Sequence, residues 1–163
     1  MALISEKFNE AVVKQIGEEV YSAYLYLSAS IWLKENSYNN LSSWFFAQYN
    51  EELSHAYKFI NYVIDTGGKV KLPEISAPKS DWTSVKEIVK AAYEHEQYIT
   101  KKIHELMALA EELKEYSPHE LLRWFITEQI EEEASTEELV VRQAAFNNDM
   151  LFDANTTRSS SEE

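Results

Sequence analysis

Six polar residues stand at positions where a helical core normally carries leucine or phenylalanine. Apolar residues recur at three- and four-residue spacing along each long helix-forming run, and polar side chains interrupt each stripe near its middle. The interrupting residues are Glu19, Glu52, His55, Glu96, Gln129 and Glu132. We therefore expect these six side chains to point into the interior of the protein.

Residues of these types can bind metal ions. Burial of a lone ionised carboxylate is costly, and four buried together repel one another, so they require compensating positive charge. The stripes carry no lysine or arginine, and two divalent cations would neutralise four carboxylates. His55 and the amide oxygen of Gln129 would add neutral ligands. A ligand set rich in oxygen and poor in nitrogen suits iron or manganese.

Four long helices must position these side chains. The chain has only three glycines and three prolines, which cluster and leave long uninterrupted runs between them. The runs predict helices over about residues 6–36, 41–66, 84–114 and 118–146. The six polar residues lie near the midpoints, so antiparallel packing would bring them to one level. A single inward Glu or His is usually an ordinary core residue, but coincidence on four helices is much harder to explain.

The connections between the helices predict a particular topology. The turn-prone segment Asn36–Asn40 is short, so the first two helices should be antiparallel neighbours. Gly67-Gly68 ends the second helix, and Pro73 and Pro78 favour an extended segment that can cross the length of a bundle. Two short connections around one long crossover indicate an all-α, ferritin-like four-helix bundle.

Capping motifs place two of the helix starts. Thr83 or Ser84 should cap the third helix, with Glu87 completing a Ser-x-x-Glu box. The run Ser117-Pro118-His119-Glu120 has the pattern of a cap, a first-turn proline and a box glutamate for the fourth helix. One domain should therefore span residues 1–148. Residues 149–163 should form a short fifth helix near Asp149 and a polar tail, disordered from Thr156 onward.

Composition narrows the classes of partner. The 28 acidic and 15 basic residues give a formal charge of -13, which disfavours nucleic acids and anionic membranes and favours cations. The absence of cysteine excludes disulfides and thiolate-bound metals. The sequence shows no membrane-spanning stretch and no secretory signal, so we expect a soluble, cytoplasmic protein.

The motifs in combination resemble the ferritin family, specifically the non-haem ferritins of prokaryotic type, over about residues 5–147. The matching segments are Glu19-Val20-Tyr21 followed by Tyr26, Glu51-Glu52-Leu53-Ser54-His55, Glu96-Gln97, and Trp124 followed by Glu128-Gln129-Ile130-Glu131-Glu132-Glu133. The resemblance implies an iron-storage protein with ferroxidase activity. Such a protein oxidises Fe(II) with dioxygen or peroxide and stores the ferric mineral in a homo-oligomeric cage of twenty-four subunits.

The resemblance also implies the roles of individual residues. A first iron ion would bind Glu19, Glu52 and His55, and a second would bind Glu52, Glu96 and Glu132, with Gln129 close by and Tyr26 as a redox-active or hydrogen-bonding neighbour. A third iron site would use Glu51, Glu128 and Glu131, joined by Glu132. From spacing alone, those residues are equally consistent with a solvated acidic face.

Some residues differ from the patterns of neighbouring families, and these differences limit which family properties we expect here. A bacterioferritin would place methionine directly after the bridging glutamate, where Leu53 stands, so we expect no haem. Animal ferritins have acidic channel residues at the positions of His119 and Leu122, so the iron entry route is unassigned. The segment from Asp149 is short and polar for a fifth helix. His95 and His104 flank the core stripe and are expected to be surface residues.

Two other functions remain open on the residues alone. One is a di-iron oxidase or peroxidase of rubrerythrin-like type, acting on peroxide or an organic substrate. An organic substrate needs an apolar pocket, and the inward neighbours Tyr26, Phe59, Ile99 and Phe125 are too bulky to leave one. The other is a metal-free structural bundle whose polar layer fixes helix register.

Overall fold

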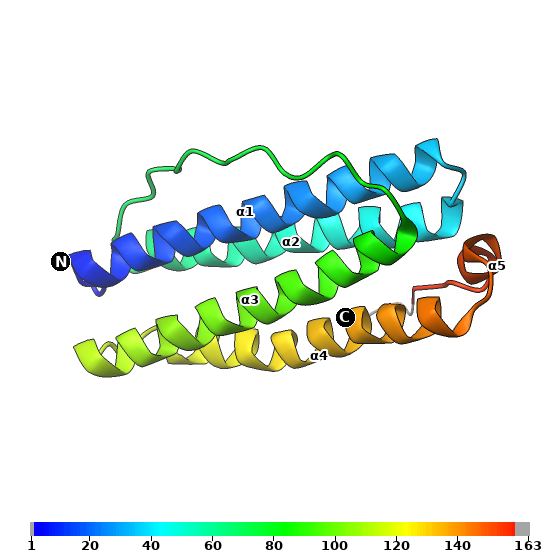
Figure 1. The fold of residues 1–163 in the computed structure, drawn as a ribbon. Helices are drawn as coiled ribbons and strands as arrows, with labels where there is room; N and C mark the ends of the chain where they lie inside the picture. The colour runs from blue at the N-terminus through cyan, green and yellow to red at the C-terminus, as the bar shows by residue number, and fades with distance from the viewer. Residues whose placement is uncertain (1, 159–163) are drawn as a thin grey trace.

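The computed structural model describes residues 2–158 and contains five helices in that part of the chain. The helices are α1 (Glu6–Glu35), α2 (Asn39–Asp65), α3 (Val85–Leu113), α4 (His119–Ala145) and α5 (Asp149–Ala154). In Figure 1, α1 and α2 form one pair, α3 and α4 form another, and α5 lies across one end. The predicted four-helix bundle with a short fifth helix is confirmed, and each predicted boundary lies within a few residues of the observed one.

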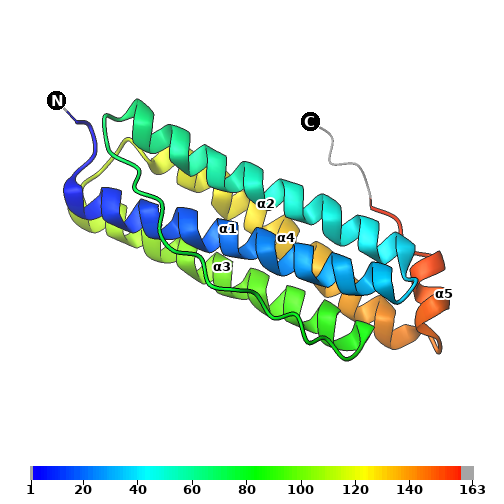
Figure 2. The same ribbon diagram turned by 90° about the horizontal axis from the view of Figure 1, so that it is seen from above.

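The connection between α2 and α3 is the predicted long crossover. It runs the length of the bundle against α1 (Figure 2). Gly17 permits this approach, because a Cβ atom at Gly17 would lie 2.8 Å from the ring of Pro73. The crossover returns the chain to the end of the bundle where α1 finishes, so that α3 begins there and runs parallel to α2 (Figure 1). None of the described helices is long and apolar enough to cross a membrane.

One predicted cap forms and another does not. The Ser84 hydroxyl accepts a hydrogen bond from the backbone N of Glu87 at 3.1 Å, while the Glu87 carboxylate caps the backbone N of Thr83 at 2.8 Å. The predicted Ser117 cap is wrong. Helix α4 begins at His119 without a side-chain cap, and the Ser117 hydroxyl instead lies 2.9 Å from the Tyr62 hydroxyl of α2. A contact between the α3–α4 connection and α2 has replaced the local one.

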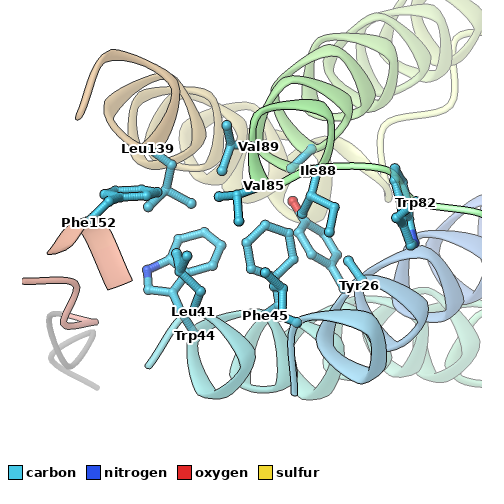
Figure 3. Close-up of a cluster of buried hydrophobic side chains, with 13 residues drawn as sticks. Tyr26, Leu41, Trp44, Phe45, Trp82, Val85, Ile88, Val89, Leu139 and Phe152 are labelled. Atoms are coloured by element: carbon cyan, nitrogen blue, oxygen red, sulfur yellow. The ribbon is translucent and has the colours of Figure 1, made fainter. Parts of the chain in front are cut away.

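Apolar side chains pack in two clusters, one toward each end of the bundle. The cluster near α5, shown in Figure 3, includes Tyr26, Phe45 and Phe152. The opposite cluster includes Phe59 and Phe125, whose rings stack with centroids 4.2 Å apart. Both clusters exclude water, so the polar layer between them lies in a low-dielectric interior.

The C-terminal segment packs on the bundle further than the sequence predicts. Phe152 of α5 is fully buried, and Thr156 is 2% exposed, with its hydroxyl donating to the Phe152 carbonyl at 2.7 Å. Arg158 reaches back to form an ion pair with Glu51 of α2. The expectation of disorder from Thr156 is therefore wrong for residues 156–158. Residues 159–163, to which the same expectation applied, lie outside the described part of the chain.

Candidate metal centre

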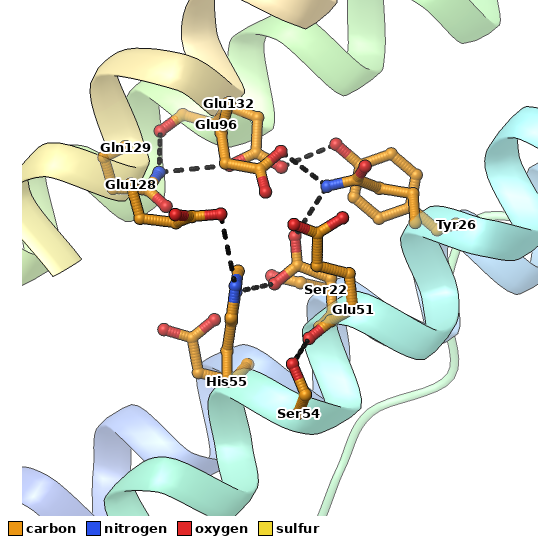
Figure 4. Close-up of polar contacts among 12 residues, drawn as sticks. Ser22, Tyr26, Glu51, Ser54, His55, Glu96, Glu128, Gln129 and Glu132 are labelled. Atoms are coloured by element: carbon orange, nitrogen blue, oxygen red, sulfur yellow. Dashed lines mark hydrogen bonds and ion pairs between the residues drawn. The ribbon is translucent and has the colours of Figure 1, made fainter. Parts of the chain in front are cut away.

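The structure brings the six predicted polar residues together in one buried layer. Each is at most 4% exposed, and they come from all four long helices: Glu19 (α1), Glu52 and His55 (α2), Glu96 (α3), Gln129 and Glu132 (α4). Figure 4 shows residues of α2, α3 and α4 facing one another across the bundle axis. The inference from the core stripes that these side chains point inward is confirmed.

Two groups of three possible ligands overlap at Glu52. One consists of Glu19, Glu52 and His55, and the other of Glu52, Glu96 and Glu132. Within each group, one ligand atom per residue lies within 4.8 Å of the others. A carboxylate has two oxygens, so Glu52 can contribute one to each group. Glu52 can therefore belong to both groups of possible ligands at once.

Hydrogen bonds hold most of the carboxylate oxygens in place. Gln15 donates to Oε1 of Glu19 at 2.9 Å, and Gln48 donates to Oε2 of Glu132 at 2.5 Å. Sequence reasoning did not single out these two glutamines. Their signal was present, because each lies four residues before a buried glutamate on the same helix face, at the spacing where glutamine and carboxylate side chains meet.

Gln129 contacts Glu96 through its side-chain nitrogen. Its side-chain nitrogen donates to Oε2 of Glu96 at 3.1 Å and also lies 3.3 Å from the Glu96 carbonyl oxygen. The sequence prediction used the amide oxygen of Gln129 as a metal ligand. The amide nitrogen faces Glu96 and helps to hold its carboxylate, and the role of the amide oxygen as a ligand stays a prediction.

Burial raises the pKa of all four central glutamates above its usual value of 4.5. For Glu52 and Glu132 the increase is large, because repulsion from neighbouring carboxylates, above all Glu96, adds to desolvation. For Glu19 and Glu96 desolvation also dominates, and partial compensation comes from charges and hydrogen bonds around them. The layer is thus short of positive charge, as expected of groups that bind cations.

One carboxylate oxygen in the layer lacks a hydrogen-bond partner within the part of the chain that the structure describes. Oε2 of Glu19 is buried and has no hydrogen-bond partner among the described residues. An unpaired buried carboxylate oxygen costs free energy unless a donor or a cation satisfies it. Glu19 belongs to the first three-residue group, so a cation bound there would satisfy this oxygen. The residues present therefore fit a metal ion on structural grounds.

A third group of possible ligands lies beside the first two. It consists of Glu51, His55, Glu128 and Glu132, again with ligand atoms within 4.8 Å of one another. Nε2 of His55 is 3.9 Å from Oε1 of Glu128, while Nδ1 faces Oε2 of Glu52 at 3.0 Å. Glu131, which was predicted for the third site, contributes no atom to this group. We call these four residues the accessory site.

A cavity of about 730 Å³ opens onto the accessory site. Its walls carry Glu51, Glu128 and Glu131, together with the rings of Trp44 and Trp124. The cavity is therefore lined by acidic groups beside the centre. The bulky neighbours Tyr26, Phe59, Ile99 and Phe125 are all fully packed in the core, as the sequence suggested.

His95 was expected to be an ordinary surface residue, but it is partly buried between α1 and α3. Its Nε2 forms a 2.7 Å hydrogen bond with the Ser22 hydroxyl, which also lies 3.0 Å from the Glu18 carbonyl oxygen. Burial lowers the His95 pKa to about 4, which keeps the ring neutral. This bond ties α1 to α3 directly beside Glu96. His104 is exposed, as expected.

Comparison with known proteins places the chain in a family. A family model described as the ferritin-like domain matches residues 9–144, most of the four-helix bundle. The chain belongs to the ferritin family. The resemblance inferred from the motifs is thereby confirmed, and iron storage is the general role that this membership supports.

Individual ferritins resemble this chain in sequence and in structure. A bacterial non-heme ferritin of Campylobacter jejuni is 39% identical over 132 residues, which cover 81% of this chain and 79% of the relative. Another from Staphylococcus aureus is 33% identical over 135 residues, covering 83% and 81%. The solved open pore ferritin of the archaeon Archaeoglobus fulgidus superimposes with a TM-score of 0.90 at 39% identity, covering 94% of this chain and 96% of that one.

Proposed function

We propose that this ferritin oxidises Fe(II) with dioxygen at the buried centre and stores the ferric product. The observation that carries the proposal is the pair of overlapping three-ligand groups that share Glu52 in a buried layer. Two Fe(II) ions held side by side can each give one electron to a single dioxygen molecule. Iron is the substrate of this reaction, and the carboxylates stabilise its ferric state.

The protein's part in this chemistry is to neutralise charge and fix geometry. The central glutamates have raised pKa values before metal enters, so they lose bound protons as cations replace them. His55 offers a nitrogen to the first ion, and Tyr26 and Gln129 hold the two oxygens of Glu96. The layer is thus preorganised for cations, and at neutral pH its free energy is lower with cations bound than without them.

Storage requires that oxidised iron leave the centre. The accessory site shares His55 and Glu132 with the buried centre and faces the acid-lined cavity. An ion that moves from the centre to the accessory site can therefore stay bound to a shared ligand throughout. We propose that subunits assemble into a cage, as the twenty-four-subunit ferritins do, with this cavity on the path to the interior. Membership in the ferritin family and superposition on an open pore ferritin support the assembly.

The function can be tested by adding Fe(II) aerobically to the purified protein, with ferric absorbance and particle size followed together. We expect fast oxidation and an iron load far above two ions per chain. Glu52→Ala and His55→Ala should each slow the initial rate by about a hundredfold, since Glu52 joins both groups and His55 is a direct ligand. The matched control is Glu94→Ala, an exposed carboxylate on α3, which should behave as wild type.

Three results would overturn parts of the proposal. Fast oxidation that survives in both variants would reject the site assignment. A load of two ions per chain that never increases would favour a resident di-iron oxidase or peroxidase. Failure to bind metal at all in equilibrium dialysis would favour a structural bundle.

A further inference from the structure

Arg158 places a fixed positive charge at the accessory site. Its guanidinium forms an ion pair with the Glu51 carboxylate, its Nη1 lies 3.4 Å from the Trp44 carbonyl, and its Cζ lies 5.5 Å from the Trp44 ring centroid. Arg158 also lines the cavity that opens onto the accessory site. The contact joins residues 107 positions apart, so local structure does not produce it.

The segment before Arg158 is firmly attached to the bundle. The Asp153 carboxylate accepts a hydrogen bond from the backbone N of Leu41 at 2.8 Å, and Phe152 and Thr156 are buried. Arg158 follows Thr156 by only two residues, so the guanidinium is held near α2 at a high effective concentration. Its ion pair with Glu51 is therefore favoured over solvation of the free side chain.

The Arg158 guanidinium also supplies positive charge to the acidic accessory site. Glu51 and Glu128 are partly buried members of the accessory site, and burial raises the pKa of Glu128. Half-burial lowers the pKa of Arg158, but a guanidinium stays protonated at any physiological pH. Lys58, another cation on the cavity wall, lies over the Trp124 ring at 4.2 Å, and no ion pair involving it is found within the described residues.

We propose that Arg158 is a built-in counter-ion of the accessory site, which an incoming divalent cation must displace from Glu51, so that filling the site releases residues 157–158 from the bundle while the buried Thr156 stays packed. The inference rests on the proposed function, because it takes the accessory site to bind metal. A divalent ion and a guanidinium that compete for one carboxylate repel each other strongly in a partly buried position. Metal affinity and segment release are then reciprocal, as for any two linked equilibria.

The first test measures metal affinity without any oxidation chemistry. Zn²⁺ is titrated calorimetrically into the metal-free protein, where the centre should take two ions and the accessory site a further, weaker one. We expect Arg158→Gln to tighten the third binding event by about tenfold, or 1.4 kcal/mol, while leaving the first two unchanged. Arg158→Lys, which keeps the charge, should change it by less than about threefold.

Lys58→Gln is the matched control for this titration. It removes one positive charge from the same cavity wall, so it reports long-range electrostatics without direct displacement from Glu51. We expect it to tighten the third event by no more than about twofold. Equal effects of Lys58→Gln and Arg158→Gln, or no effect of Arg158→Gln, would overturn the displacement. Loss of the first two events would instead count against the proposed function itself.

The second test follows the C-terminal segment directly. The chain has no cysteine, so Thr157→Cys gives a single attachment point for a nitroxide on an exposed residue next to Arg158. Zn²⁺ is diamagnetic, and its third equivalent should sharpen the spectrum as the label becomes mobile. A label at Met150→Cys on α5 should not change, since α5 stays docked. An immobile Thr157 label at full Zn²⁺ occupancy would contradict the release.

Discussion

The Tyr26 hydroxyl of α1 donates a 2.5 Å hydrogen bond to Oε1 of Glu96 on α3. Tyr26 is 1% exposed, and burial together with the nearby carboxylates raises its pKa well above the usual 10.0. The phenol is therefore protonated at neutral pH and donates to Glu96. Because Gln129 donates to the other oxygen, the Glu96 carboxylate has a single orientation before any metal binds.

Removal of the Tyr26 hydroxyl should loosen this orientation. A hydrogen bond to a charged group contributes about 1.5–3 kcal/mol, so we expect Tyr26→Phe to slow the initial oxidation of Fe(II) by about tenfold while the bundle stays folded. Stopped-flow ferric absorbance gives the rate, and circular dichroism checks the fold. Tyr24→Phe is the control, because Tyr24 lies on the same helix and is 43% exposed. An unchanged rate in Tyr26→Phe would show that Gln129 alone fixes Glu96.

The metal-free protein should gain stability when a central charge is removed. Glu52 is 2% exposed and repelled by Glu96 and Glu19, so its ionised form destabilises the empty bundle at neutral pH. We expect Glu52→Gln to raise the free energy of unfolding by about 1–3 kcal/mol at pH 7, measured by urea denaturation with a chelator present. Glu94→Gln, on the exposed face of α3, should change it by less than about 0.5 kcal/mol. A destabilised Glu52→Gln variant would mean that the Glu52 carboxylate makes net favourable contacts without metal.

Stability should also depend on pH, with a sign set by the central glutamates. Their folded pKa values lie above the unfolded value of 4.5, so the folded state binds more protons, and the stability they contribute at low pH is lost as pH rises. His95 acts in the opposite direction between about pH 4 and 6.5, because its folded pKa is lowered. The decline in stability should therefore be clearest above pH 6.5.

Thermal unfolding of the metal-free protein between about pH 6.5 and 8.5 checks this dependence. The midpoint should fall with rising pH without metal and should be nearly constant or rise with saturating Zn²⁺, because the metal binds the deprotonated carboxylates. A metal-free midpoint that does not fall through this range would mean that the folded protein holds no extra protons on these glutamates there.

Features that depend on a repeating local pattern were predictable from the sequence. The helices follow from the clustering of glycine and proline, and the inward position of Glu52 follows from the apolar stripe that it interrupts. Two errors came from contacts between residues far apart in the sequence. Ser117 bonds Tyr62 in place of capping α4, and His95, which flanks its stripe, faces Ser22 because α1 packs closely there. Neither partner is marked by sequence spacing.

The C-terminal segment shows the same limit more strongly. A polar, serine-rich stretch lacks the apolar surface that normally holds a segment in place, so composition favoured disorder. Arg158 is held by one charge pair with Glu51 and by the attachment of α5 before it. The orientation of the Gln129 amide was equally unpredictable, because spacing places an amide but does not determine which end faces Glu96.

We expect Asp153 to hold α5 against α2. Helix α2 has no side-chain cap of its own at Tyr38, and the Asp153 carboxylate supplies one from α5 by accepting from the third backbone N–H of the helix, at Leu41. Loss of such a cap costs about 0.5–2 kcal/mol. We therefore expect Asp153→Ala to lower the free energy of unfolding by about 1 kcal/mol in urea denaturation, while Asp153→Asn, which keeps an acceptor oxygen, should lower it by less.

Asp149→Ala is the control for the loss of a carboxylate on α5, since Asp149 accepts only from the Gln143 side chain among the described residues. A smaller effect than that of Asp153→Ala is expected. The same Asp153→Ala variant should also free a nitroxide at Thr157 without any metal, because Arg158 then loses the attachment that holds it near Glu51. A rigid label in that variant would show that the Arg158 pair holds the segment on its own, and that α5 contributes only to the stability of α2.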